Sequence, residues 1–295
     1  MVNSIALAQN FLGVCDMKYK RESLTAILDA APGAVDFVGA NVCKVYKLSS
    51  DGLGNYSRNN GYPTGSVTGA WETLTLTKDR GVELKVDRFD NEESKSMAFG
   101  QLADVFMRES VVPELDAYRF AKMSTAQTLV KADITVGTTD CVGLIDTAEM
   151  QMAEEEVPEE GRILYVSPKM YAGIKAKVTR YLANENGVNR EIIKFNNMPV
   201  IVVPQSRFNT AITLNDGSSY FGFAPTAGGY KINFMIVHPS AVKNVIKAQI
   251  PKIFTPDEFQ GGDCYALQYR LYHDCFLWEN KVKGIYTHTA STANS

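Results

Sequence analysis

Alternation of apolar and polar residues is the clearest pattern in the first third of the chain. It runs through residues 71–78 and again through 82–87, where Val82, Leu84 and Val86 alternate with charged neighbours. A period of two is typical of half-buried antiparallel strands. Asp79, Arg80 and Gly81 predict a bend or bulge between the two stretches. With the β-rich segment 42–48 before them, they predict a long hairpin over residues 41–89.

The connection between the two arms of this hairpin is unusually long. Residues 49–70 are polar and rich in glycine and asparagine, whereas most hairpin loops need only about 2 to 5 residues. Aromatic and arginine side chains, which are enriched in protein interfaces, lie in or beside it: Tyr56, Arg58, Tyr62 and Trp71. The segment predicts an arm that lies on another molecule. A surface loop with a local aromatic cluster is the alternative.

A charged helix is predicted directly after the hairpin, from residue 91 to about residue 123. Asp90 or Asn91 can cap it, and Glu92 and Glu93 would lie in its first turn, near the positive end of the helix dipole. Apolar residues gather on one face, at Phe99, Leu102, Val105, Phe106 and Val112. Pro113 lacks a backbone donor and predicts a kink or a restart. The pattern fits a strut, or an ordinary amphipathic core helix.

Shorter elements fill the rest of the chain. Between 130 and 233 we expect an acidic helix at 146–156, strands at 161–167, 198–203 and 220–224, and a helix capped by Ser167 that begins at Pro168. Beyond this mixed α/β module we expect a strand at 234–237, a short helix at 239–247, extended segments at 250–254, 264–278 and 281–288, and a disordered tail at 291–295.

Composition sets limits on function. The 295 residues are 45% hydrophobic and 21% charged, which indicates a globular chain of two or more subdomains. The net charge of −3 disfavours a dedicated nucleic-acid or membrane binder, and no apolar run approaches the roughly 20 residues of a membrane span. The apolar stretch 4–15 has no basic region before it, so secretion is not expected. Five scattered cysteines fit reduced thiols in a cytoplasm.

Candidate chemistry is sparse. The three histidines, His238, His273 and His288, have no metal-ligand spacing with one another or with a cysteine, and no cofactor motif is present, so we expect neither metal nor cofactor. His273 and Cys275 would share one face of a strand, where a histidine base could activate a thiol nucleophile. We favour the simpler interpretation that both are packed residues of a sheet.

The order of these parts resembles the major capsid proteins of tailed bacteriophages, the Hong Kong 97 type fold. The stretches that carry the resemblance are VDRFD at 86–90, VPELDAYRF at 112–120, RILYVSP at 162–168, RLYHD at 270–274 and ENKVKGIY at 279–286. The resemblance implies an α+β fold divided into an N-terminal arm (1–40), an extended hairpin loop (41–89), the spine helix of a peripheral domain (90–129), an axial domain (130–233), return strands of the peripheral domain (234–290) and the tail.

The implied function is that of a shell subunit, not an enzyme, which self-assembles into hexamers and pentamers around double-stranded DNA. Its hairpin would overlap the adjacent subunit, with Tyr56, Arg58, Tyr62, Trp71, Arg88 and Glu92 as candidate inter-subunit contacts. The short segment before residue 41 implies a separate scaffolding protein; a portal protein and weakly contacted DNA are further implied partners. The implied location is the virion, and the host cytoplasm during assembly.

Two alternatives remain open at this point. An encapsulin-type compartment shell would have the same fold and an enzyme cargo, and a cytoplasmic thiol enzyme would use Cys275. Some capsid proteins of this type crosslink through Lys and Asn; Lys47 and Asn280 are candidates by residue type only, so no crosslink is predicted.

Overall fold

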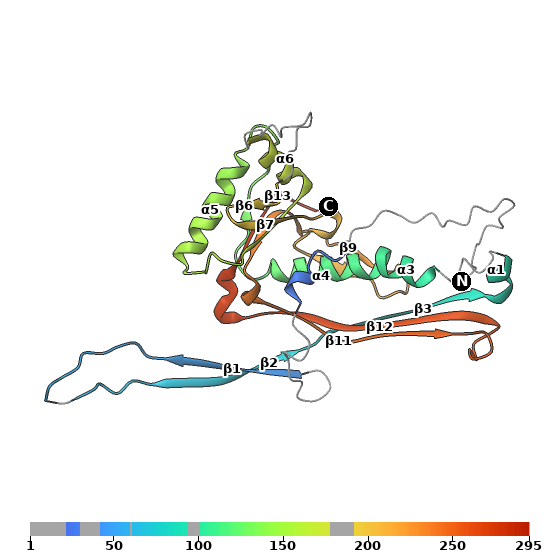
Figure 1. Ribbon diagram of the computed structural model, residues 1–295, viewed down its shortest axis with the longest axis horizontal. Helices are drawn as coiled ribbons and strands as arrows, with labels where there is room; N and C mark the ends of the chain where they lie inside the picture. Colours follow the sequence, from blue (N-terminus) through green and yellow to red (C-terminus); the bar gives the residue numbers. More distant parts are fainter. Residues whose placement is uncertain are drawn as a thin grey trace, which may run out of the picture.

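The computed structural model describes residues 22–29, 42–59, 61–93, 99, 101–177 and 192–294. These residues form an elongated α+β molecule, which confirms the expected fold class (Figure 1). A hairpin, β1 and β2, projects to one side, and a long three-stranded sheet, β3, β12 and β11, extends to the other. A second, six-stranded sheet and its helices form the body between these two extensions.

The hairpin consists of β1 (Val42–Ser50) and β2 (Val67–Thr75), which pair antiparallel in unbroken register from Val42 opposite Thr75 to Ser50 opposite Val67. The expectation of one hairpin over residues 41–89 was wrong in its second half. The strand β3 (Lys78–Asp87) pairs with β12 in a different sheet. The chain passes between the sheets at Leu76 and Thr77, because Leu76 is buried in the body and Asp274 binds Thr77.

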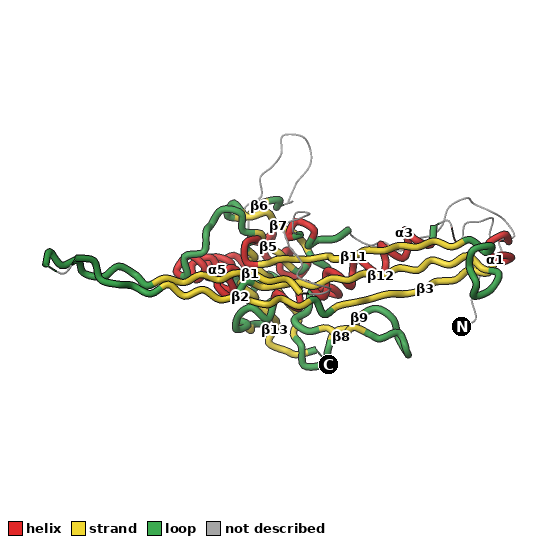
Figure 2. Tube along the Cα trace, turned by 90° about the horizontal axis from the view of Figure 1, so that it is seen from below, coloured by secondary structure: helices red, strands yellow, loops and turns green. Residues whose placement is uncertain are grey.

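The three-stranded sheet has the order β11-β12-β3 (Figure 2). The predicted long strand at 264–278 is confirmed as β12 (Cys264–Leu277). The predicted helix at 239–247 was wrong: a 3-10 turn, η4 (Pro239–Ala241), leads into the strand β11 (Val242–Phe254). Val242 and Val245 explain the difference, since β-branched residues favour a strand where a partner such as β12 is available.

The charged helix lies along one face of this sheet. It comprises α1 (Arg88–Glu93), α3 (Leu102–Phe106), the π-helical turn η2 (Met107–Val111) and α4 (Val112–Met123), and the residues between α1 and α3 are described only at Phe99 and Gln101. The predicted break at Pro113 takes the form of this π-turn. Pro113 has no N–H to donate to the carbonyl four residues earlier, and a wider turn precedes it.

The six-stranded sheet has the order β4-β13-β10-β5-β7-β6. Its strands are β4 (Val130–Lys131), β13 (Ile285–Ala293), β10 (Tyr230–Val237), β5 (Ile163–Val166), β7 (Met198–Val202) and β6 (Lys194–Phe195). In β5, Leu164 and Val166 face one hydrophobic core while Ile163 and Tyr165 face the other. Both faces of the central strands are covered, which explains why they read as continuous apolar runs.

Helices α5 (Cys141–Glu154) and α6 (Pro168–Lys177) pack in the core that Leu164 and Val166 face. The predicted cap of α6 is confirmed, since the N–H of Met170 donates to Oγ of Ser167 at 3.2 Å. The two helices approach closely at Gly173, where an added Cβ would lie 2.3 Å from Sγ of Cys141.

Several boundaries differ from the sequence-based expectation. Among the strands of segment 234–290, β10 and β13 pair in the six-stranded sheet, whereas β11 and β12 pair in the three-stranded one. The predicted extended segment 281–288 begins as a 3-10 helix, η5 (Glu279–Gly284). The predicted disordered tail continues β13 to Ala293, and the N–H of Asn294 donates to the carbonyl of Gly229 at 2.6 Å. The strand expected at 220–224 is β9 (Phe223–Pro225), paired with β8 (Ile212–Leu214).

Residues 22–29 lie against α4. They contain one 3-10 turn, η1 (Ala26–Leu28), and are held mainly by the buried carboxylate of Asp116. This carboxylate accepts hydrogen bonds from the N–H groups of Leu24 and Thr25 and from the hydroxyls of Ser23 and Thr25. A segment with little regular structure of its own is thereby fixed to the helix.

Candidate contact surfaces

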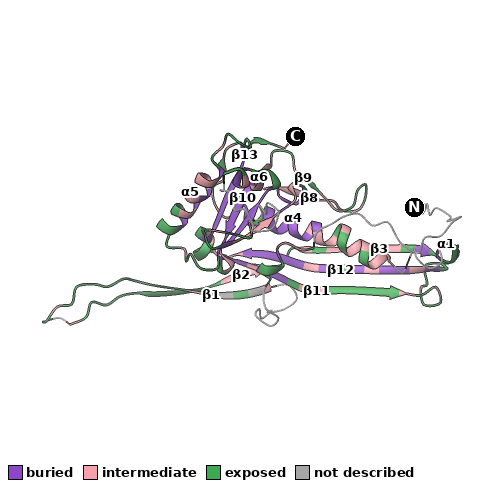
Figure 3. Cartoon of the chain, turned by 45° about the horizontal axis from the view of Figure 1, so that its top comes forward, coloured by how far each residue is buried: buried purple, intermediate pink, exposed green. Residues whose placement is uncertain are grey.

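One face of the hairpin is an exposed apolar stripe, which we define as Tyr46, Leu48, Val67 and Trp71. The strand register places all four on the same face, and they are 52%, 62%, 68% and 65% exposed. Most of the hairpin is coloured as exposed in Figure 3. The rings of Tyr46 and Trp71 lie 5.1 Å apart. Within the described residues no third strand pairs with the hairpin. A lone two-stranded hairpin is marginally stable in water, so this stripe is suited to being covered.

A glycine lies beneath the tyrosine of this face. The hydroxyl of Tyr46 lies over Gly69, where an added Cβ would come within 1.8 Å of it. A larger residue at position 69 would therefore push the ring of Tyr46 away from the strand.

The tip of the hairpin carries the other aromatic candidates. The rings of Tyr56 and Tyr62 meet edge to face at 5.0 Å, and the side chains are 60% and 87% exposed. Ser57 and Gly61 exchange backbone hydrogen bonds at 3.1 and 2.7 Å, which closes the turn. Arg58 lies exposed within that turn. The structure thus brings Tyr56, Arg58 and Tyr62 together, and places Trp71 further down the same hairpin.

The last two candidates, Arg88 and Glu92, lie at the opposite end of the molecule (Figure 1). Nε of Arg88 is 3.7 Å from the carboxylate of Glu92, and Nη1 is 3.6 Å from Asp263, so Arg88 joins α1 to the start of β12. Both side chains of the Arg88 and Glu92 pair are exposed. The six candidates therefore form two groups at the two ends of an elongated chain.

The root of the hairpin is attached to the body on its other face. Nζ of Lys47 lies 2.8 Å from the carboxylate of Glu72 and also contacts the carboxylate of Glu279 in η5. Hydrogen bonds to Glu279 and then to Glu72 raise the pKa of Lys47. At the end of the hairpin, the N–H and the hydroxyl of Thr77 both donate to Oδ2 of Asp274, at 2.8 and 2.9 Å.

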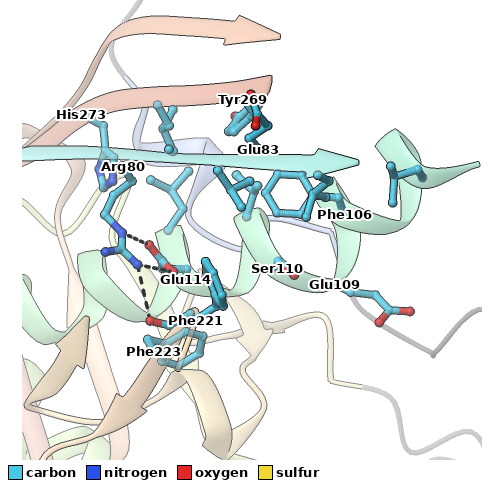
Figure 4. Close-up of a pocket in the computed structure, with 18 of the residues that line it drawn as sticks. Arg80, Glu83, Phe106, Glu109, Ser110, Glu114, Phe221, Phe223, Tyr269 and His273 are labelled. Atoms are coloured by element: carbon cyan, nitrogen blue, oxygen red, sulfur yellow. Dashed lines mark hydrogen bonds and ion pairs between the residues drawn. The ribbon is translucent and has the colours of Figure 1, made fainter. Parts of the chain in front are cut away.

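A groove of about 1150 Å³ runs between β3, the helix and the loop around Phe221 (Figure 4). Arg80 crosses it, with Nε 2.7 Å from Oε1 of Glu114 (Figure 4). Its Nη1 also donates to the carbonyl of Asn215 at 2.6 Å. Apolar side chains, including Phe106 and Phe223, form much of the wall. Sequence reasoning missed this groove. The alternation of β3 predicted one wall, but no pattern indicated that the loop lies beside it.

The candidate thiol and histidine lie in the interior. Burial raises the pKa of Cys275 to about 12 and lowers that of His273 to about 4. The ring of His273 meets that of Tyr118 edge to face at 5.4 Å, and no hydrogen bond joins it to Cys275. A thiol nucleophile needs an accessible thiolate. Burial of both groups therefore opposes catalysis at this position.

The described ranges contain neither a metal-binding cluster nor a membrane-spanning helix. No group of three or more His, Cys, Asp or Glu side chains there could hold a metal ion. None of the helices described is both long enough and apolar enough to cross a membrane.

Comparison with known proteins finds structures with the same fold but no relative that is similar in sequence. No protein-family model matches the chain, and no curated protein matches it by sequence. Solved structures do match over almost its whole length, and they include phage capsids. The chain therefore has a fold found in bacteriophage capsids.

Three of these structures illustrate the similarity. The mature capsid of bacteriophage PhiM1 matches with a TM-score of 0.71 at 11% identity, covering 96% of this chain and 92% of that one. A structure from Gordonia phage Cozz gives a TM-score of 0.67 at 11% identity, covering 97% and 92%. The capsid of cyanophage P-SCSP1u gives 0.65 at 13% identity, covering 98% and 93%.

Proposed function

We propose that this chain is the major capsid protein of a tailed bacteriophage and that copies of it assemble into the shell that encloses the double-stranded DNA. The observation that supports this proposal most strongly is the structural match to the PhiM1 mature capsid over 96% of this chain. Because the match covers the hairpin, the long sheet and the body, the similarity extends to the whole architecture and is not limited to one common domain.

The two-ended shape supports the same proposal. Closed rings need two different complementary surfaces on each subunit. The apolar stripe and the tyrosine tip lie on one extension, and Arg88 and Glu92 lie at the end of the other. In the proposed shell the hairpin lies on the neighbouring subunit in hexamers and pentamers, so that each copy covers the next.

The proposal carries further expectations about partners and place. A separate scaffolding protein directs assembly, a portal protein occupies one vertex, and DNA is contacted weakly, in keeping with a net charge of −3. The protein resides in the virion and, during assembly, in the host cytoplasm. It performs no catalysis.

The test is electron microscopy of the purified protein, alone and coexpressed with its neighbouring genes. Closed shells or hexameric rings are expected, and a uniform monomer or dimer under every condition would contradict the proposal. Nucleic acid inside the shells supports a capsid, whereas an enzyme cargo would identify a compartment shell instead.

A variant with a shortened hairpin tests the role of the tip. The register leaves Ser50 opposite Val67, so replacing residues 51–66 by Asn-Gly closes the shortened hairpin with a two-residue turn. We expect this variant to fold with an unchanged unfolding midpoint and to form no shells. Normal shells from the shortened chain would contradict the role given to the tip.

A further inference from the structure

Among the described residues, the joint that connects β2 of the hairpin to β3 of the body is two residues long. Thr75 ends β2 and Lys78 begins β3, so Leu76 and Thr77 connect two separate sheets. Leu76 is 3% exposed and packs with Val245 and Phe276. This is a short connection with a buried anchor, which is the geometry of a hinge.

Asp274 of β12 binds this joint through its carboxylate. Its Oδ2 accepts both the N–H and the hydroxyl of Thr77, and its Oδ1 accepts the hydroxyl of Tyr118 at 2.6 Å. Asp274 is 4% exposed. Hydrogen bonds to a buried carboxylate are strong and costly to leave unmade. The joint is therefore tied to β12 and to α4 at the same point.

A second attachment lies further out along the hairpin. Lys47 is five residues beyond Val42 on β1, a distance of about 17 Å along a strand. There it contacts Glu279, whose side chain is 73% exposed, as well as Glu72 of β2. Exposed ion pairs are weak and sensitive to salt. This attachment can open without disturbing the core.

We propose that the hairpin is held at two unequal points, a permanent pivot at Thr77 and Asp274 and a releasable contact between Lys47 and Glu279 that sets its angle. Within the described residues, Leu74 and Leu76 join the hairpin root to the apolar interior, through the small cluster around Phe276. With the outer contact open, the hairpin can change direction about the joint while β1 and β2 stay paired. Lys47 and Glu279 are then positioning residues for the interaction arm.

This role in assembly rests on the proposed function, whereas the two-point attachment does not. A shell subunit whose arm must reach its neighbour at one angle depends on whatever sets that angle. The contact that sets it joins the hairpin to η5 through Lys47.

The experiment measures hairpin direction in dilute, unassembled subunits. Spin labels on p-acetylphenylalanine, introduced at Val67 on the hairpin and Met150 on α5, report one distance by double electron–electron resonance; both positions are exposed. We expect a narrow distribution in the otherwise unchanged protein. Lys47→Met and Glu279→Gln should each make it roughly twofold broader, as should high salt.

Lys44→Met is the matched control. Lys44 lies three residues earlier on β1, is exposed, and has no ion pair within the described residues, so its loss should leave the distribution unchanged. A distribution in Lys47→Met equal to that of the Lys44 control would overturn the proposal.

Electron microscopy of the same variants separates the two claims. Irregular or open shells from Lys47→Met, beside regular shells from Lys44→Met, are expected. Regular shells from a variant with a broadened distribution would overturn the role of the contact in assembly. Failure of the unmodified chain to assemble would overturn the proposed function and leave the distance result standing.

Discussion

The carboxylate of Asp116 lies 3.0 Å from Nη1 of Arg207 in the protein interior, where the two side chains are 0% and 3% exposed. Because four donors from residues 23–25 bind the same carboxylate, this ion pair also anchors the N-terminal segment to α4. A buried charge with so many donors is stabilised only while its partners remain.

Removing that carboxylate should be strongly destabilising. Asp116→Ala leaves Arg207 buried without its counter-ion, and we expect a loss of about 3 to 5 kcal/mol in the free energy of unfolding, measured in urea. Asp104→Ala, which removes an exposed carboxylate paired with Arg108 on the same helix, is the control and should change it by less than about 0.5 kcal/mol. Equal effects of the two substitutions would refute the anchoring role.

Acid should destabilise the fold through two buried histidines. Burial lowers the pKa of His273 and of His288 to about 4, against about 6.5 in the unfolded chain. The unfolded state therefore binds protons that the folded state does not, and the stability present above pH 6.5 is lost as the pH falls toward 4. Thermal unfolding between pH 7 and 4 measures this, and His288→Gln should flatten the profile.

Trp71 should matter for assembly and not for folding. It is 65% exposed, so Trp71→Ser should shift the unfolding midpoint little, within about 0.5 kcal/mol. Thr73→Ser, on the same exposed face two residues away, is the control. We expect light scattering to show slow or absent shell formation for the tryptophan variant alone. Loss of stability without loss of assembly would contradict the assignment.

The close approach of α5 and α6 can be tested by a pair of substitutions. Gly173→Ala would place a methyl group 2.3 Å from Sγ of Cys141 and should destabilise by about 1 to 3 kcal/mol. Adding Cys141→Ala removes the sulfur and should recover part of the loss. A double-mutant cycle in urea gives the coupling, and additive losses would show that the two residues do not press on each other.

Cys275 should resist alkylation in the folded protein. Its thiol is buried and burial raises its pKa to about 12, so little thiolate exists at neutral pH. Mass spectrometry of peptides after iodoacetamide treatment should show modification at this residue only in denaturant. Rapid modification in the native state would revive the thiol-enzyme alternative.

Much of the fold follows from local pattern. The tyrosine tip, the cap at Ser167 and the long strand β12 depend on neighbouring residues, and sequence predicted them. The division between hairpin and β3 did not follow, since the alternation is the same on both sides of Thr77. What separates them is a hydrogen bond to Asp274, 197 positions away.

The buried polar contacts were also beyond the sequence. From the sequence, Asp116 looks like an ordinary charged residue on a helix surface, and Arg80 looks like an ordinary charged residue in a bend. Their partners, Arg207 and Asn215, come from segments that only the tertiary fold brings near. Of the six candidate contact residues, sequence reasoning indicated the kinds of side chain, but not that they divide between the two ends of the molecule.

The π-turn gives the charged helix one extra residue between two fixed packing contacts. Because η2 (Met107–Val111) closes its hydrogen bonds over five residues in place of four, it holds one residue more than an α-helix would use there. Phe106 packs on Tyr269 on one side of the turn, and Leu115 packs beside them on the other. A single-residue deletion within the turn, combined with replacement of Pro113, would restore an uninterrupted helix. In a lineage of such proteins, chains one residue shorter at this place could share the same architecture.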